Sequence, residues 1–248
     1  MPEPSLTSLS EFRELVVTTD AFGPERKAVK YRFLAPDEVR PDAKFPLVLF
    51  LHGAGERGND NRKQLLYLPD TLSQIPNRKR YPCFAVAPQC PQNMKWVDVP
   101  WDEEASPPQP AASGPMKMVL AILDEVLHTW PIDPARIYLT GLSMGGFGAW
   151  DLAMRRPKQF AAVAPLCGGG DELQAALLKD VPIWAVHGEM DAAVPVNRSR
   201  RMIKAIENAG GKPKYTELPG VGHNCWSKAY APDFGLLDWM FEQRRTGT

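Results

Sequence analysis

At residues 141–146 the chain reads Gly-Leu-Ser-Met-Gly-Gly, and this stretch decides the fold. The segment before it, 136–140, is β-branched and aromatic enough to form a buried strand. The segment after it, 147–155, holds helix-forming residues and no proline. The stretch therefore predicts a sharp turn from a strand into a helix, with Ser143 at the apex in a strained backbone conformation.

A serine in such a turn is presented above the sheet, where it is available for chemistry. The spacing Gly-x-Ser-x-Gly in a strand–turn–helix is the nucleophile-elbow pattern, in which small residues let the helix pack close to the strand. A glycine-rich turn with an incidental serine shows the same spacing by chance, so the flanking strand and helix carry the prediction. We therefore predict that Ser143 is a nucleophile.

A serine hydroxyl is a weak nucleophile, so Ser143 needs a base to take its proton and an acid to orient the base. On a parallel sheet these partners follow later strands in the order serine, acid, histidine. Asp191 follows the apolar run 181–186, and His223 lies in a glycine-rich loop after the last candidate strand. We predict Asp191 as the acid, with Glu189 as the rival carboxylate, and His223 as the base.

Small residues follow the first core strand at 51–58, where the chain reads Leu-His-Gly-Ala-Gly-Glu-Arg-Gly. A backbone amide in such a loop stabilises the oxyanion of acyl transfer together with the amide that follows the nucleophile. The predicted donors are the amides of Ala54 and Met144. Glu56 and Arg57 either pair and brace this loop or leave Arg57 facing the substrate.

A metal site is the alternative chemistry for the same edge of the sheet. The residues that can converge there are His52, His187, His223 and Asp191. No His-x-His or His-Glu-x-x-His spacing is present, and a serine nucleophile needs no metal, so we expect no metal and no other cofactor. The four cysteines show no zinc-binding spacing, and their even number leaves disulfides open.

Short apolar runs alternate with helical patterns along the chain. The predicted strands are 15–17, 29–34, 46–51, 84–87, 137–140, 161–166, 181–186 and 214–218. The predicted helices are 116–130, 147–155, 172–178, 197–208 and 234–243. This alternation predicts an α/β fold with a central, mostly parallel sheet, helices on both faces and the first two strands as an edge hairpin.

Residues 92–114 interrupt this alternation with Trp96, Trp101, three acidic residues at 102–104 and a proline-rich run. A long loop in a compact domain is usually functional or disordered. We interpret it as a loop insertion or flap near the active site, and a solvated surface loop is the alternative.

The whole chain limits the classes of partner. Its 248 residues fit a single domain over 1–248, and 29 acidic residues balance 29 basic ones, so no nucleic-acid partner is expected. No apolar run reaches the roughly 18 residues that span a membrane. The first twelve residues lack the basic start and apolar centre of a signal peptide, so we expect a cytoplasmic protein, or an exported one whose signal peptide is absent from this sequence.

Taken in order, four motifs resemble those of the α/β-hydrolase superfamily. They are His-Gly-Ala-Gly-Glu-Arg-Gly at 52–58, Gly-Leu-Ser-Met-Gly-Gly at 141–146, His-Gly-x-x-Asp-x-x-Val-Pro at 187–195 and Gly-x-Gly-His at 220–223. Within the superfamily the chain looks like the phospholipase/carboxylesterase and feruloyl-esterase-like group, often labelled predicted peptidases. The resemblance runs from about residue 45 to the C-terminus, and it implies an α/β-hydrolase fold with Ser143, Asp191 and His223 as the triad and Ala54 and Met144 at the oxyanion site.

The chain also departs from its apparent relatives. Some secreted feruloyl esterases and polyester depolymerases join a cysteine just before the serine to one just after the histidine. Here Leu142 precedes the serine and Cys225 lies two residues beyond the histidine, so that brace is absent and Cys225 either packs freely or meets Cys167. Residues 1–44 match nothing sharply and are interpreted as an added antiparallel edge.

The predicted function is that of a serine esterase acting on small-molecule carboxylic esters with short-chain or phenolic acyl groups. A peptidase or acyltransferase with the same triad, or a non-catalytic binding scaffold, is the alternative. Candidate pocket residues are Trp96, Trp101 and Trp226, each of which can equally fill the core. The sequence does not predict the oligomeric state.

Overall fold

The computed structural model describes residues 3–40 and 42–245 and contains one eight-stranded sheet. The strands are β1 (Arg13–Thr19), β2 (Lys27–Leu34), β3 (Phe45–Leu51), β4 (Phe84–Pro88), β5 (Ile132–Leu142), β6 (Ala162–Leu166), β7 (Trp184–Gly188) and β8 (Lys214–Leu218). The α-helices are α1 (Leu6–Glu11), α2 (Leu68–Ser73), α3 (Ile75–Arg80), α4 (Gly114–Thr129), α5 (Met144–Arg155), α6 (Asn197–Asn208), α7 (Trp226–Ala229) and α8 (Leu236–Glu242). The 3-10 helices are η1 (Ala54–Glu56), η2 (Lys63–Leu65), η3 (Glu172–Leu178) and η4 (Pro232–Phe234). None of the helices in the described ranges combines the length and the apolar character needed to cross a membrane.

The strands lie side by side in the order β1-β2-β4-β3-β5-β6-β7-β8. β1 pairs with β2, and β2 with β4, in antiparallel register, whereas every later neighbour pair is parallel. The predicted sheet, mostly parallel with an antiparallel edge made by the N-terminal strands, is therefore confirmed.

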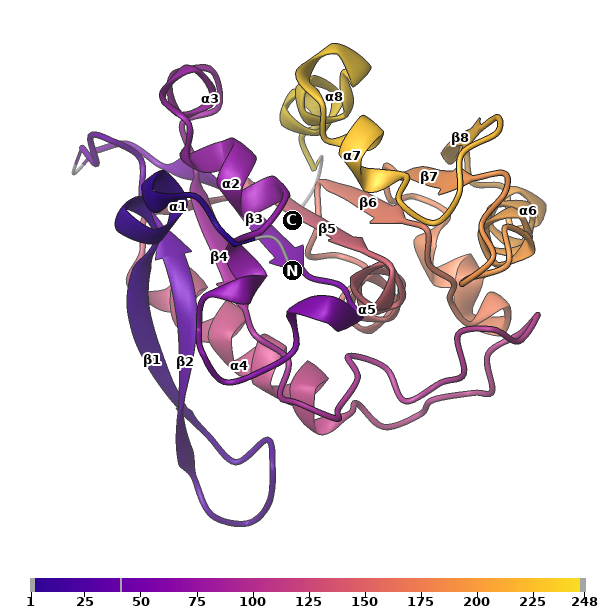
Figure 1. Ribbon diagram of the computed structural model, residues 1–248, viewed down its shortest axis with the longest axis horizontal. Coiled ribbons are helices and arrows are strands. Elements are labelled where there is room, and N and C mark those ends of the chain that lie inside the picture. The colour runs from indigo at the N-terminus through magenta and orange to yellow at the C-terminus, as the bar shows by residue number, and fades with distance from the viewer. Residues whose placement is uncertain (1–2, 41, 246–248) are drawn as a thin grey trace.

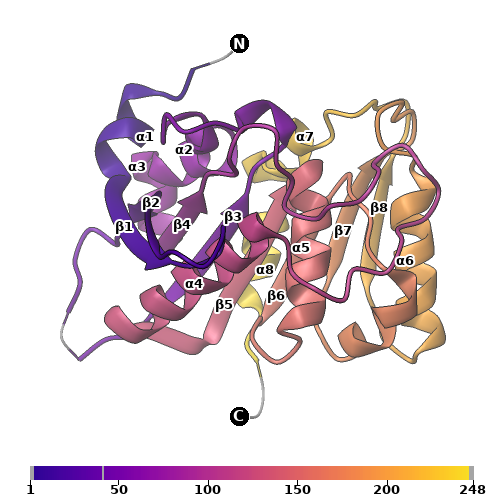
Figure 2. The ribbon, with the colours of Figure 1, turned by 90° about the horizontal axis from the view of Figure 1, so that it is seen from below.

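Helices cover both faces of the sheet, as Figures 1 and 2 show. α4, α5 and α6 pack on one face, and α2 and α8 pack on the other. Side chains of β3 alternate between the two cores, with Leu47, Leu49 and Leu51 on the first face and Val48 and Phe50 on the second. Because both faces are covered, β3 is apolar at each of these positions.

Several local details differ from the sequence predictions. The segment 172–178 folds as the 3-10 helix η3. α4 begins at Gly114, two residues earlier than predicted, because the Ser113 hydroxyl caps it by accepting the Met116 amide at 3.1 Å. The helices α1, α2, α3 and α7 were not predicted, since each has four to six residues, too few to show helical periodicity.

The predicted turn at the serine is present and strained. Ser143 has φ 53° and ψ −119°, a region that side-chain-bearing residues rarely occupy. Its amide donates to the Leu166 carbonyl at 2.9 Å, which ties the turn to β6. Gly145 lies so close to β3 that a Cβ there would be 1.9 Å from the Leu51 carbonyl oxygen. The start of α5 is thus held against the ends of β3 and β6, the two strands that flank β5.

We expect Gly145→Ala to destabilise the fold by about 3 kcal/mol or more, since the new methyl group must push two backbone segments apart. Chemical and thermal unfolding measure the loss. Gly55→Ala is the matched control, because a Cβ at Gly55 meets no atom within 4 Å. Equal stability of the two variants would contradict this account of how the turn is held.

Candidate active site

Three predicted residues meet at the carboxyl ends of β5, β7 and β8. Ser143 lies directly before α5, Asp191 follows β7, and His223 follows β8. Ser143 Oγ is 2.8 Å from His223 Nε2, and His223 Nδ1 is 2.7 Å from Asp191 Oδ2. A carboxylate only accepts hydrogen bonds, so Nδ1 carries the imidazole proton and Nε2 is the acceptor for the serine hydroxyl.

The carboxylate of Asp191 is fully buried and receives hydrogen bonds on both oxygens. Oδ1 accepts the amides of Ala193 and Val194, each at 2.9 Å. Oδ2 accepts Nδ1 of His223 and also lies 3.1 Å from Nε2 of His187. Burial alone would raise the pKa of Asp191, but the hydrogen bonds from these four groups outweigh it and lower the pKa, so the acid stays ionised.

Main-chain hydrogen bonds hold the aspartate turn against the histidine loop. The Met190 amide donates to the Val221 carbonyl at 2.8 Å. Glu189, the rival carboxylate, accepts a hydrogen bond from the Gly220 amide at 2.9 Å. It therefore holds the histidine loop at an exposed position. The carboxylate that contacts the imidazole is therefore that of Asp191.

Ala54 and Met144, the predicted oxyanion donors, are the first residues of η1 and α5. An amide at this position has no carbonyl acceptor within its own helix, so it is available to a bound oxyanion. The two segments are in contact, because a Cβ on Gly53 would lie 2.8 Å from Leu142 Cδ1. The loop that carries Ala54 thus lies beside the serine turn.

Arg57 and His52 brace this loop. Arg57 Nε donates to the Ala54 carbonyl at 2.8 Å, so Arg57 braces the loop through the main chain, and the described residues show no ion pair between Glu56 and Arg57. The buried His52 ring donates from Nδ1 to the Gly53 carbonyl at 2.6 Å and accepts the Cys90 amide on Nε2 at 2.9 Å. Burial lowers the pKa of His52 to about 4, and the Cys90 amide leaves no room for a second ring proton.

The three tryptophans suggested for a substrate pocket have different surroundings. Trp96 is fully buried and donates from Nε1 to the His52 carbonyl at 2.9 Å, so its prediction as a pocket wall is wrong and it packs beneath the loop. Trp101 is half-buried, with Lys95 Nζ 4.8 Å from the centre of its ring. Trp226 is half-buried and stands edge-on to His223, with 5.2 Å between ring centres, so it adjoins the triad.

Tyr67, which the sequence analysis did not single out, lies beside Trp226. Its ring lies 5.7 Å from that of Trp226, and its backbone is strained at φ 65° and ψ −112°. Burial raises the pKa of Tyr67, and the nearby Glu56 carboxylate adds to the effect. Strain at a non-glycine residue is typical of functional sites. No sequence pattern around position 67 indicates the strain or the position of Tyr67, so both could be found only in the structure.

Two of the four cysteines, Cys167 and Cys225, lie close behind the triad. All four are buried and free. The Cys225 thiol and the Cys167 amide approach the same Val186 carbonyl, at 3.7 Å and 2.9 Å. Cys167, Asp191 and His223 also form, among the described residues, a group of metal-ligand types with atoms within 4.8 Å of one another. Two of the three already hydrogen-bond to each other, an arrangement that suits activation of the serine.

Residues 92–113 contain no helix or strand, and Figure 2 shows the segment crossing α5 towards α6. Its anchors are arginine side chains bound to main-chain carbonyl oxygens: Arg155 to residues 109–111, Arg198 to Glu103 and Arg201 to Glu104. Arg198 is fully buried and also contacts the Ser106 hydroxyl. The segment, called the flap below, is therefore tied to both helices.

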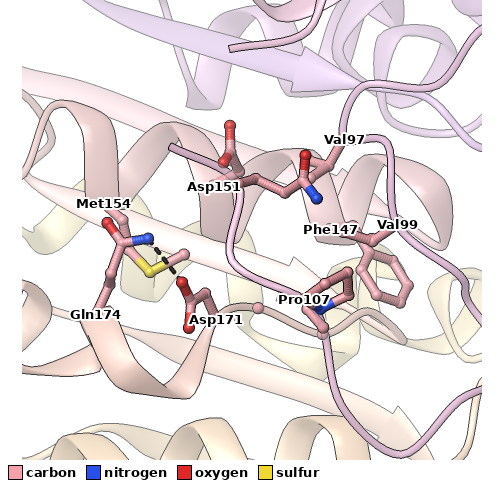
Figure 3. Close-up of a pocket in the computed structure, with 12 residues that line it drawn as sticks. Val97, Val99, Pro107, Phe147, Asp151, Met154, Asp171 and Gln174 are labelled. Atoms are coloured by element: carbon pink, nitrogen blue, oxygen red, sulfur yellow. Dashed lines mark hydrogen bonds between the residues drawn. The ribbon is translucent and has the colours of Figure 1, made fainter. Parts of the chain in front are cut away.

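A pocket lies between the flap and α5 (Figure 3). Val97 and Pro107 come from the flap, and Phe147, Asp151 and Met154 come from α5. None of the triad residues lines it. This pocket is therefore separate from the triad.

The sheet topology, with the serine turn at its carboxyl edge, defines an α/β-hydrolase fold, as the sequence resemblance predicted. The profile of the phospholipase/carboxylesterase family matches residues 38–231, and the chain belongs to that family.

Known proteins resemble the chain over different lengths. The crystal structure of a thermostable esterase matches 95% of this chain and 64% of that one, at 38% identity and a TM-score of 0.84. A probable feruloyl esterase C of Aspergillus niger is 29% identical over 116 residues, 44% of this chain and 40% of that protein. A ferulic acid esterase of Anaeromyces mucronatus, solved with ferulic acid, covers 98% of this chain and 92% of that one at a TM-score of 0.67 and 14% identity, a likeness of fold. The matched regions span less than two thirds of the first two proteins.

His52 makes the fold sensitive to acid. Its pKa is about 4 in the folded chain and about 6.5 in the unfolded one, so between pH 6.5 and pH 4 mainly the unfolded state gains the proton. Stability from this group is complete above pH 6.5 and is lost towards pH 4, by about 1.4 kcal/mol per pH unit. Glutamine does not titrate, so we expect the unfolding free energy of His52→Gln to fall less steeply with decreasing pH, by about 1.4 kcal/mol per pH unit.

Urea unfolding at a series of pH values between 4 and 7 measures the slope. His128→Asn is the control, because His128 is exposed on α4. If the unfolding free energy of His52→Gln changed with pH as steeply as that of the wild type, the fold would not be what keeps the His52 ring neutral.

Proposed function

We propose that this chain hydrolyses carboxylic esters through an acyl-enzyme formed on Ser143. The observation that carries the proposal is the unbroken hydrogen-bonded series from Ser143 Oγ through both nitrogens of His223 to Asp191 Oδ2. Membership of the phospholipase/carboxylesterase family supports it.

In the proposed acylation step, His223 Nε2 takes the proton of Ser143 as Oγ attacks the ester carbonyl carbon. The amides of Ala54 and Met144 are the proposed donors to the oxyanion that forms. His223 then gives its proton to the leaving alcohol. A water deprotonated by the same imidazole releases the acid, while the ionised Asp191 holds the ring in place. Because a protonated imidazole cannot accept the serine proton, kcat/KM falls towards acid pH.

For the substrate we propose small-molecule esters with short-chain or phenolic acyl groups. Trp226 and Tyr67 form an aromatic surface beside His223, and flat aromatic groups pack well against such surfaces. The similarity to a feruloyl esterase supports the phenolic alternative.

Replacing the nucleophile tests the proposal directly. We expect Ser143→Ala to lower kcat/KM for 4-nitrophenyl acetate by about 10⁴-fold or more, because no other group can form the acyl-enzyme. A fluorophosphonate probe should label the wild type and leave Ser143→Ala unlabelled. Ser10→Ala, exposed on α1, is the control. Failure of the wild type to label would favour a non-catalytic scaffold.

A substrate series separates the acyl groups. We expect acetyl and butyryl nitrophenyl esters, or methyl ferulate, to be cleaved with higher kcat/KM than long-chain nitrophenyl esters. Matched amides and esters of the same acid, followed by release of amine or alcohol, separate esterase from peptidase activity. A preference for long acyl chains would overturn the small-ester proposal, and faster release of the amine would favour a peptidase.

A further inference from the structure

The mechanism above leaves one buried histidine beside the catalytic acid without a role. His187 is the second-last residue of β7 and is fully buried. Its Nε2 lies 3.1 Å from Asp191 Oδ2 and 3.1 Å from the Val194 carbonyl oxygen. Its Nδ1 lies 2.8 Å from the Ser199 hydroxyl. No substrate atom can reach a ring so placed.

The neighbours of the ring decide where its proton lies. The ionised carboxylate of Asp191 and the Val194 carbonyl can only accept, so Nε2 of His187 carries a proton and donates it. Asp191 Oδ2 therefore receives two imidazole N–H groups, one from His223 at 2.7 Å and one from His187 at 3.1 Å.

Ser199 holds the far side of the ring. It is buried in the first turn of α6, and its hydroxyl lies between His187 Nδ1 and the Gly168 carbonyl, 3.1 Å away. Glu217, the register partner of His187 on β8, is a further charged neighbour, and its carboxylate pairs with Arg200 of α6. The ring is thus fixed from α6 as well as from the aspartate turn.

We propose that His187 is a positioning residue of the esterase reaction, which fixes the Asp191 carboxylate and shares its charge with His223 through a second imidazole N–H donor. The proposal rests on the proposed function. Removing the second donor frees the carboxylate to move and leaves its whole charge to His223. The movement of the carboxylate slows turnover. The undivided negative charge stabilises the protonated form of the His223 imidazole.

Two substitutions of His187 with similar volume test this. His187→Met removes the donor. We expect kcat to fall by about 10- to 100-fold, the size of loss typical when a group that orients a metal-binding side chain is removed. KM should stay within about twofold, because the ring is buried away from substrate. The acid limb of the kcat/KM profile should move to higher pH. His187→Gln keeps an amide donor near the Nε2 position and should restore both kcat and the profile towards wild type.

Ser199→Ala provides a second route that keeps the histidine. We expect a smaller fall in kcat and a shift of the acid limb in the same direction, because His187 loses the contact at Nδ1. Fluorophosphonate titration counts active molecules, so a loss of folded protein is separated from a loss of turnover.

The proposal is overturned if His187→Met keeps the wild-type acid limb, if its loss lies in KM or in the number of active molecules, or if His187→Gln is no better than His187→Met. If His187→Met does not fold, an unchanged profile in Ser199→Ala overturns it. Failure of the wild type to label or to cleave esters would instead count against the proposed function.

Discussion

The structure depends on one close contact between backbones, where the first turn of α5 meets the ends of β3 and β6. Gly145 lies against the Leu51 carbonyl, and the Ser143 amide is bound by Leu166. These two contacts hold a serine in a conformation that an isolated chain would leave. The same contact fixes the position of the Met144 amide, so the nucleophile and one proposed oxyanion donor are set together.

Electrostatics organises the rest of the site around Asp191. A buried carboxylate is unfavourable unless hydrogen bonds replace water, and here two amides and two imidazoles do so. The donors come from the aspartate turn, β7 and the histidine loop. Segments that are distant in sequence are therefore held together by one shared charge.

Much of this arrangement could be predicted from the sequence, because the relevant signals are local. The spacing around Ser143 predicts the turn, and the apolar runs predict a mostly parallel sheet, which places Asp191 and His223 at the same edge. The surroundings of Trp96 could not be predicted, since whether an indole fills the core or faces a cleft depends on the path of the flap.

Other features have no local signal at all. The strain at Tyr67 arises from the loop before α2 and is invisible in the residue types. The contact of His187 with Asp191 depends on the tight turn between them, and that of Ser199 depends on how α6 packs. The His-Gly pair that ends β7 belongs to a recognisable motif, but a motif does not state which atoms meet.

The anchoring of the flap has a consequence for how this chain can diversify. Arg155, Arg198 and Arg201 hold it mainly by main-chain carbonyl oxygens, which every residue type supplies. Substitutions along residues 103–111 can therefore alter the shape and charge that the flap presents while its attachment to α5 and α6 persists. The fold thus borders the hydrogen-bonded Ser143, His223 and Asp191 with a segment in which most side chains can vary while the attachment of its backbone is kept, an arrangement that lets new specificities arise without rebuilding the scaffold.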